Sequence, residues 1–304
     1  MNFKEDNLLA EVLNGLFKIY EKQVPDVKLI SSAMLSEKII ENKNEIVNDH
    51  IAFRTLGLAN LGIQSFEKIF MYHGYVKKEY YYFKTKKLNA YWYSHKNQEY
   101  PRIFISELRV QDLSLISRKI INKYTNHITE DPIESICLDN PREVLNFFIK
   151  PLWSIPTLAD YLSLHDESEY ASWVIYNRYY LNHYTISVHA LKKGWNTIFE
   201  FNYFLEKTGI ILNDSGGVIK ISEDGLLLQS SSVAQSLVVE FIDGKKHKIS
   251  GSYVEFAERK VLPEFTYLAS EQVKNIHRRD GFEAANADKI FESTYSTQFK
   301  NKKK

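Results

Sequence analysis

Two histidines and a glutamate lie in three stretches of this sequence that could bring them together. His50 lies in NDHIAFRTL and His183 in HYTISVHAL, while Glu255 lies in YVEFAER. Two imidazoles and one carboxylate on one side of a metal leave other positions open, which suits a non-haem Fe(II) that binds both a substrate and O2. The alternative is that both histidines are hydrogen-bonded core residues, and the pattern alone does not decide between the two.

Strand alternation determines which side chains can share such a site. Residues two apart on a strand point to the same face, so His50 and Arg54 share one face, while Ile51 and Phe53 share the other. The stretches around His183 and Glu255 alternate in the same way. We therefore predict that each strand packs an apolar face against helices and turns a more polar face toward a cup.

Arg54 is the main candidate for binding an anionic substrate. It lies roughly 13 Å from His50 along an extended strand, so it cannot touch the metal, but its side chain can lean back toward it. A guanidinium can hold a carboxylate through two hydrogen bonds, although Arg54 could equally pair with a structural acid. Ser231, on a polar strand, and Arg278, in HRRDGFEA, are further substrate-binding candidates, for which an edge strand and a surface charge are the respective alternatives.

The elements that must position these residues form a repeated pattern. Residues 46–110 predict a strand, an amphipathic helix closed by Gly74 and three strands. Residues 181–261 predict the same order, with a strand at 226–242 that is bent or broken midway. We predict a single catalytic domain over 1–304, with a helical cap (1–45), a first βαβββ unit (46–110), a helical insertion (111–180), a second βαβββ unit (181–261) and a C-terminal segment (262–304).

This α+β plan of duplicated βαβββ units resembles the vicinal-oxygen-chelate superfamily, in which each unit curls its sheet around half of an incomplete barrel. Under the repeat, Glu107 in ISEL takes the place that Glu255 holds in the second unit, and so becomes a candidate fourth ligand or a residue beside the ligands. Four protein ligands resemble the glyoxalase branch of the superfamily, and three ligands with open positions resemble its dioxygenase branch. The sequence leaves this choice open.

Five motifs narrow the resemblance: NDHIAFRTL, NHYT, LLQSSSVA, GSYVEFAER and RRDGFEAANADKIFEST. From about residue 46 to residue 298, they resemble as a set the 2-oxoadipate dioxygenase/decarboxylase family, also called hydroxyglutarate synthase. The resemblance implies an Fe(II) enzyme with His50, His183 and Glu255 as metal ligands and Arg54 on a substrate carboxylate. It implies conversion of 2-oxoadipate and O2 to 2-hydroxyglutarate and CO2, in lysine catabolism.

Two rival functions fit the same fold. A glyoxalase-like isomerase or lyase would use Glu107 as a fourth ligand to Ni(II), Zn(II) or Mn(II) and would turn over without O2. A non-catalytic protein would use the cup to bind a ligand and would hold no metal.

Composition excludes several other classes of function. Lys and Arg number 39 against 38 Asp and Glu, so the basic excess typical of a nucleic-acid binder is absent. The single cysteine, Cys137, excludes an intramolecular disulfide and a multi-cysteine metal site. No apolar stretch reaches the ~18–20 residues needed to span a bilayer, and the first residues lack the apolar region of a secretory signal. We expect a cytoplasmic protein, and its oligomeric state is not set by the sequence.

Overall fold

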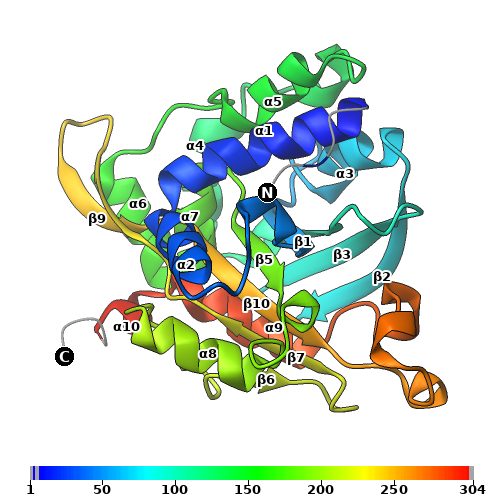
Figure 1. Cartoon of the computed structure of the whole chain (residues 1–304). Helices are drawn as coiled ribbons and strands as arrows, with labels where there is room; N and C mark the ends of the chain where they lie inside the picture. The colour runs from blue at the N-terminus through cyan, green and yellow to red at the C-terminus, as the bar shows by residue number, and fades with distance from the viewer. Residues whose placement is uncertain (1–2, 4–6, 301–304) are drawn as a thin grey trace.

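A mixed eight-stranded sheet runs through the molecule. The structure is a computed structural model that describes residue 3 and residues 7–300, with side chains to residue 298 (Figure 1). The strand order is β2-β3-β4-β1-β5-β10-β7-β6. The bounds are β1 Asn48–Leu56, β2 Tyr75–Phe83, β3 Leu88–His95, β4 Arg102–Leu108, β5 His183–Ser187, β6 Lys220–Ile221, β7 Leu227–Ser231 and β10 Tyr253–Arg259. A separate hairpin pairs β8 (Ser236–Glu240) with β9 (Lys246–Ser250).

The two halves of the sheet mirror each other in connectivity. In the first half β1 pairs in parallel with β4, and in the second β5 pairs in parallel with β10. The halves join where β1 and β5 pair antiparallel at the centre of the sheet. Each half also carries a helix directly after its first strand, α3 (Ile63–Tyr72) and α8 (Ile198–Lys207). The predicted α+β fold with duplicated βαβββ units is confirmed.

The second unit departs from its predicted strands in two places. The stretch predicted as a strand over 183–191 ends at Ser187, and Val188–Ala190 form a 3-10 helix. The strand predicted at 226–242 is two strands, because the chain leaves the sheet after β7 and enters the β8–β9 hairpin. This hairpin is an insertion before β10, so the unit keeps its order despite the extra strands.

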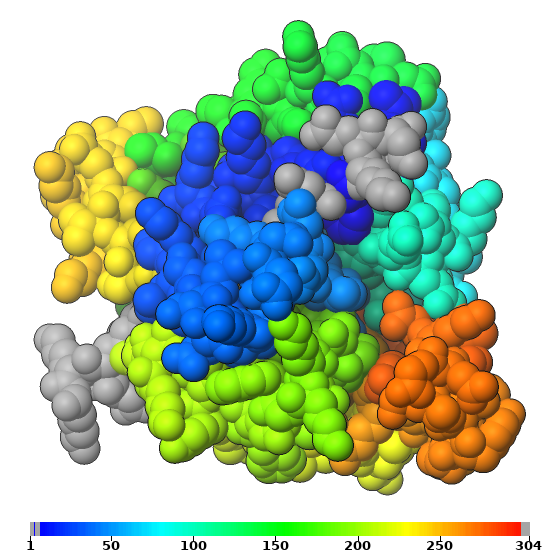
Figure 2. All heavy atoms as spheres, viewed as in Figure 1, coloured from blue at the N-terminus to red at the C-terminus, as the bar shows by residue number. Residues whose placement is uncertain are grey.

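Helices cover the outer face of the sheet, as strand alternation predicted. Phe53 of β1 packs on Phe66 of α3 at 4.9 Å between ring centroids, and Phe256 of β10 packs on Phe201 of α8 at 5.5 Å. The predicted N-terminal cap is a pair of helices, α1 (Leu8–Gln23) and α2 (Pro25–Ser36). It lies over the centre of this face (Figures 1 and 2), where Phe17 contacts Tyr184 of β5.

The predicted helical insertion contains four helices: α4 Leu115–Thr125, α5 Pro141–Ile149, α6 Leu158–Glu167 and α7 Glu169–Asn177. Helix α5 packs on the outer face, where Phe148 stacks 5.3 Å from Phe53. Helix α7 contributes instead to the inner face, because Tyr170 and Trp173 lie against the Arg54 guanidinium. The insertion therefore supplies part of the wall of the cup.

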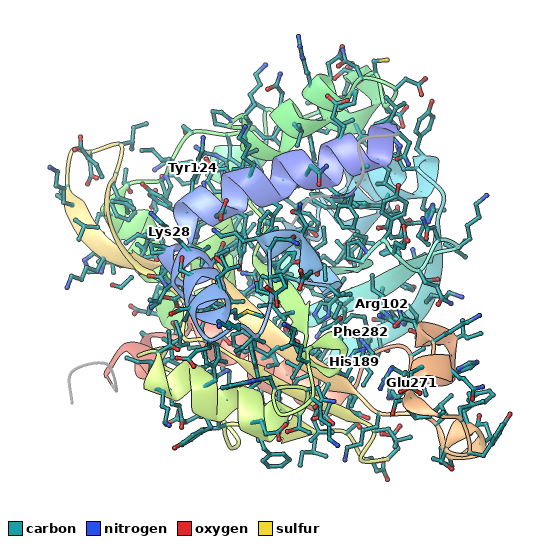
Figure 3. The ribbon with its side chains drawn as sticks, viewed as in Figure 1. Lys28, Arg102, Tyr124, His189, Glu271 and Phe282 are labelled. Atoms are coloured by element: carbon teal, nitrogen blue, oxygen red, sulfur yellow. The ribbon has the colours of Figure 1, made fainter. Side chains whose placement is uncertain are left out.

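The C-terminal segment closes the inner face of the sheet. It contains α9 (Ala284–Phe291), the 3-10 turn Glu292–Thr294 and α10 (Ser296–Lys300). The Arg259 guanidinium of β10 donates to the Gly281 carbonyl at 2.7 Å and to the Arg279 carbonyl at 3.1 Å, which fixes the entry to α9. Arg102 and Phe282 lie in this region, where the segment meets the first half of the sheet (Figure 3).

Candidate metal centre

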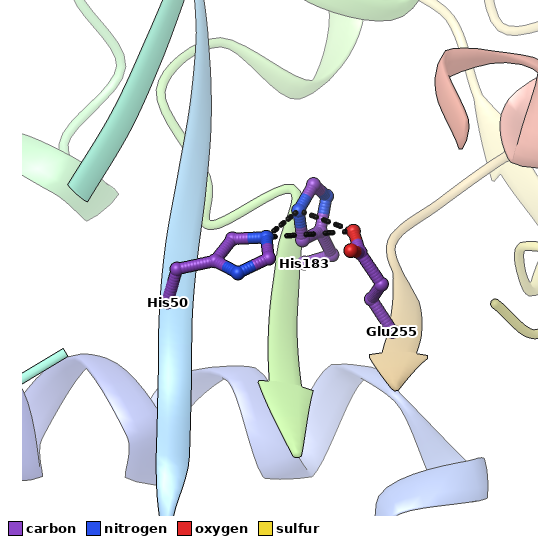
Figure 4. Close-up of side chains that lie close together, drawn as sticks. All are labelled: His50, His183 and Glu255. Atoms are coloured by element: carbon purple, nitrogen blue, oxygen red, sulfur yellow. Dashed lines mark hydrogen bonds and ion pairs between the residues drawn. The ribbon is translucent and has the colours of Figure 1, made fainter. Parts of the chain in front are cut away.

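His50, His183 and Glu255 come together at the centre of the inner face (Figure 4). They extend from β1, β5 and β10, and each is at most 5% exposed. The Glu255 Oε2 atom lies 3.0 Å from His183 Nε2 and 3.5 Å from His50 Nε2, and the two Nε2 atoms are 3.3 Å apart. Three residues that are spread over more than 200 positions of the sequence thus meet in one buried cluster.

The hydrogen bonds of the two imidazoles fix where their lone pairs point. His50 Nδ1 lies 2.8 Å from Asp49 Oδ1, and a carboxylate can only accept, so Nδ1 carries the proton. His183 Nδ1 lies 3.1 Å from Asn182 Oδ1, which accepts in the same way. Both Nε2 atoms of the neutral rings therefore present lone pairs toward each other and toward Glu255.

Three convergent lone-pair donors with no proton between the imidazoles favour a cation among them, although the Thr185 hydroxyl also lies 3.1 Å from His50 Nε2. Metal bonds to histidine and carboxylate are about 2.0–2.2 Å long, so ligand atoms at right angles on one metal lie roughly 3.0 Å apart and tetrahedral ones roughly 3.4 Å. The observed separations of 3.0–3.5 Å lie close to this range. The three residues fit a metal ion that is held on one side and open on the other.

Electrostatics favour the charge state that such an ion needs. Burial opposes ionisation of Glu255, but the two imidazoles outweigh it and hold the pKa of this carboxyl well below its usual range. Burial lowers the pKa of His183, which keeps that ring neutral. Burial also opposes the charging of His50, but Glu255 and Asp49 raise its pKa overall, so protons compete with a cation most strongly at His50.

Two contacts from neighbouring residues support the cluster, one from Asp49, which the sequence analysis did not single out, and one from Gln229, whose polar strand was expected to hydrogen-bond a carboxylate or an imidazole. Asp49 accepts two hydrogen bonds from Arg259, at 2.7 and 2.9 Å, while it orients His50. The Gln229 amide donates to Glu255 Oε1 at 2.6 Å and accepts from Asn286 of α9 at 3.0 Å. Such partners fix the orientation of metal ligands. The NDH tripeptide carried a signal for Asp49, since an acid directly precedes the histidine.

Arg54 lies on the same face, buried and, among the described residues, without an acidic partner. Its guanidinium donates to the Thr294 hydroxyl at 3.0 Å and to the Phe291 carbonyl at 3.1 Å, both uncharged groups, and its Nε atom has no hydrogen-bond partner in the described part of the chain. The Tyr170 and Trp173 rings lie 5.0 and 5.1 Å from it. A desolvated guanidinium of this kind is a strong site for a carboxylate.

The structure separates Glu107 from the cluster and corrects its predicted place in the repeat. Glu255 pairs with Thr185, two residues after His183, and the residue that pairs with Ala52, two after His50, is Phe104. Glu107 lies three residues further along β4 and therefore points to the outer face. There its carboxylate accepts from the Ile63 amide at the start of α3, at 2.9 Å.

Glu258 in the second unit is the true counterpart of Glu107. It lies three residues after Glu255, and its carboxylate accepts from the Ile198 amide at the start of α8, at 2.7 Å. In both units a glutamate on the same strand thus caps the helix that follows the first strand, where the helix dipole favours a negative charge. Glu107 has a structural contact in place of a metal contact.

The two weaker substrate-binding candidates lie away from the pocket over the cluster. Ser231 Oγ is 2.7 Å from the Ser293 hydroxyl and tethers the C-terminal segment. Arg278 donates to the Arg259 carbonyl at 2.7 Å and lines a separate surface cleft with Arg102. Neither side chain therefore lines the pocket, because the neighbouring segment 282–291 occupies that position with apolar residues.

A narrow pocket lies directly over the cluster. Besides the three ligand candidates, its walls include Phe104, Phe282, Tyr253 and the end of α9. The Phe282 ring meets the His50 ring edge-on at 4.8 Å. The walls are mostly apolar and leave little open space, so a ligand bound over the cluster would lie in apolar surroundings.

A duplicated βαβββ sheet with three convergent ligand candidates defines a fold of the vicinal-oxygen-chelate type that could hold a metal ion. The 2-oxoadipate dioxygenase/decarboxylase family model matches residues 12–275. The rice 2-oxoadipate dioxygenase/decarboxylase is 41% identical over 303 residues, and the match covers 96% of this chain and 80% of the rice protein. The Arabidopsis thaliana 2-oxoadipate dioxygenase/decarboxylase is 38% identical over 304 residues, and the match covers 96% of this chain and 79% of the Arabidopsis protein. The chain belongs to the 2-oxoadipate dioxygenase/decarboxylase family.

Solved structures agree with this assignment. The crystal structure of the rice hydroxyglutarate synthase in complex with 2-oxoadipate superimposes with a TM-score of 0.87 at 41% identity, covering 95% of this chain and 92% of that one. A Ralstonia eutropha protein described as a glyoxalase superfamily member gives 0.70 at 18% identity, covering 93% and 90%, which supports the fold alone. The resemblance inferred from the five motifs is confirmed.

The described helices bear on membrane association, and the relatives bear on cellular location. No helix among the described residues is long and apolar enough to cross a membrane. The curated plant relatives are named as chloroplastic or amyloplastic proteins, and a cytoplasmic location for this chain stays a prediction. The single-domain boundaries also stay a prediction.

Proposed function

We propose that this protein is an Fe(II)-dependent dioxygenase that decarboxylates a 2-oxo dicarboxylic acid, with 2-oxoadipate as the substrate. In this reaction 2-oxoadipate and O2 give 2-hydroxyglutarate and CO2, which balances all atoms of both reactants. The observation that carries the proposal is the placement of a His-His-Glu cluster and an acid-free buried arginine on one face of the same sheet. Such a pair of sites matches the two ends of an oxo diacid.

Each residue has a separate task in this proposal. His50, His183 and Glu255 hold the iron, which when bound supplies positions to chelate the 2-oxo acid group and to react with O2. Arg54 receives the far carboxylate of the substrate, so that the substrate is held in one orientation. Phe104 and the α9 segment exclude water around the reacting carbons.

The decisive test compares two glutamates of β10 that face opposite sides of the sheet. After anaerobic Fe(II) loading, O2 consumption and CO2 release are measured over a panel of 2-oxo diacids. Glu255→Ala should lose iron binding and O2 consumption together, because it removes the charged ligand. Glu258→Gln, which alters only the α8 cap, should keep both. Normal O2 consumption by Glu255→Ala, or turnover of wild-type protein without O2, would rule the proposal out.

A further inference from the structure

Tyr253 lies between the metal-binding cluster and Arg54. It pairs with His183 across β10 and β5, and Ala52 pairs with His183 across β1 and β5. These three residues form a row across the inner face, with His50 and Glu255 on one side of it and Arg54 on the other. The Tyr253 ring lies 4.8 Å from the His183 ring and lines the pocket. A ligand that reaches from the cluster to Arg54 therefore passes over Tyr253.

The Tyr253 hydroxyl has no hydrogen-bond partner in the described part of the chain, although the residue is 0% exposed. Arg54 and Ser293 approach the phenol closely enough to interact with it, but neither meets the distance and angle criteria of a hydrogen bond. The Ser293 hydroxyl already donates to the Ile290 carbonyl at 2.7 Å. Buried polar groups are almost always paired, so a lone buried hydroxyl beside a pocket points to a partner that arrives from outside.

The Tyr253 hydroxyl and Arg54 Nε, both without a hydrogen-bond partner among the described residues, can both donate. Arg54 Nε carries a proton at all accessible pH values, and a tyrosine hydroxyl, with an ordinary pKa of about 10, can donate a hydrogen bond at neutral pH. Two donors without an acceptor call for an acceptor-only group, and a carboxylate accepts several hydrogen bonds at once. Its charge also compensates the desolvated guanidinium, which an uncharged group cannot do.

We propose that Tyr253 determines specificity for a dicarboxylic acid, because its hydroxyl and Arg54 Nε together receive the carboxylate farthest from the 2-oxo group. This inference rests on the proposed function and extends it from Arg54 to a second donor. Tyr253 and Arg54 distinguish dicarboxylic from monocarboxylic acids by hydrogen bonding to the far end of the substrate. The metal-binding cluster binds the 2-oxo acid end, which all such substrates share. Tyr253 is thus a binding residue for one carboxylate and has no part in holding the iron.

The test crosses two proteins with two ligands of equal length. Wild-type protein and Tyr253→Phe are loaded with Fe(II) without oxygen and titrated with 2-oxoadipate and with 2-oxohexanoate, which has a methyl group in place of the far carboxylate. Binding is followed by calorimetry and by the visible charge-transfer absorbance of an Fe(II)–2-oxo acid complex. Tyr253→Phe should weaken 2-oxoadipate about tenfold or more and change 2-oxohexanoate by less than about twofold.

The unfolding midpoint of the ligand-free protein separates this binding role from a purely structural role of Tyr253. Tyr253→Phe removes a hydroxyl with no partner, so the unfolding midpoint of the free protein should not fall. Tyr179→Phe is the matched control, because its buried hydroxyl donates to the Leu61 carbonyl at 2.6 Å. It should lower the midpoint and leave the preference between the two acids unchanged.

The outcomes separate the inference from the function on which it rests. Equal weakening of both acids by Tyr253→Phe, or no weakening of either, overturns the inference while wild-type selectivity for the diacid keeps the proposed function. Wild-type protein that holds iron and binds neither acid overturns the proposed function and the inference with it.

Discussion

The Asp49–Arg259 pair offers the sharpest test of how the centre is supported. Both side chains are at most 2% exposed, and the carboxylate takes two hydrogen bonds from the guanidinium, at 2.7 and 2.9 Å. Two unit charges about 4 Å apart at an effective dielectric of about 20 attract each other by about 4 kcal/mol. Arg102 lies 3.6 Å away as a second cation, and together they hold the pKa of Asp49 well below its usual range against the effect of burial.

Asp49→Asn keeps the shape of the side chain and removes its charge. The buried Arg259 then loses its compensating partner, which costs about 3–5 kcal/mol of the free energy of unfolding. His50 also loses a charged acceptor at Nδ1, which should weaken metal binding by about 10- to 100-fold. Urea unfolding of the metal-free protein measures the first effect, and anaerobic competition against a metal indicator measures the second.

A double variant separates the ion pair from general damage. Arg259→Met alone should also be strongly destabilising, because it leaves the Asp49 charge buried. The Asp49→Asn/Arg259→Met protein should be more stable than the sum of the two losses predicts, by at least about 2 kcal/mol, since neither charge is then left alone. Additive losses, or an Asp49→Asn protein within about 1 kcal/mol of wild type, would refute this account.

Two further predictions concern His189 and Glu107. Burial lowers the pKa of His189 to about 4, and its Nδ1 atom accepts from the Arg259 amide at 3.2 Å. The unfolded chain binds this proton near pH 6.5, so the free energy of unfolding should fall by about 2 kcal/mol between pH 7.5 and pH 5. Urea titrations of His189→Gln at several pH values should show that this part of the pH dependence is gone. An unchanged pH dependence in His189→Gln would contradict the prediction. Glu107→Gln should cost about 0.5–1 kcal/mol by weakening the α3 cap and should retain iron in metal analysis, whereas loss of iron would restore Glu107 as a ligand.

Strand alternation was enough to predict the faces of the sheet. Ile51 and Phe53 pack outward and His50 and Arg54 lie inward, as the period of two requires. The same rule could not place Asp49, which alternation puts opposite to His50. The β1–β5 register shifts between Asn48 and Ile51, and this irregularity allows neighbours in sequence to meet.

The misplacement of Glu107 has a different cause. The repeat was recognised from the order of elements, and element order does not fix register. The predicted counterpart was wrong by three positions along the strand. Because side chains alternate between the two faces, a shift by an odd number of residues places the side chain on the other face. Only the pairing of β4 with β1 reveals that Phe104 is the counterpart of Glu255. A single sequence carries no signal for that pairing.

The correct register also explains why a duplicated sheet gives an asymmetric centre. His50 and His183 are equivalent, but the counterpart of Glu255 is Phe104 and the counterpart of Arg54 is Ser187, four residues after each histidine. A second carboxylate at Phe104 would supply a fourth protein ligand and more negative charge beside an anionic substrate. The phenylalanine instead lines the pocket, so the first unit adds no carboxylate to the cluster. Its buried Arg54 lies on the same face, where under the proposed function it attracts the far carboxylate of a diacid.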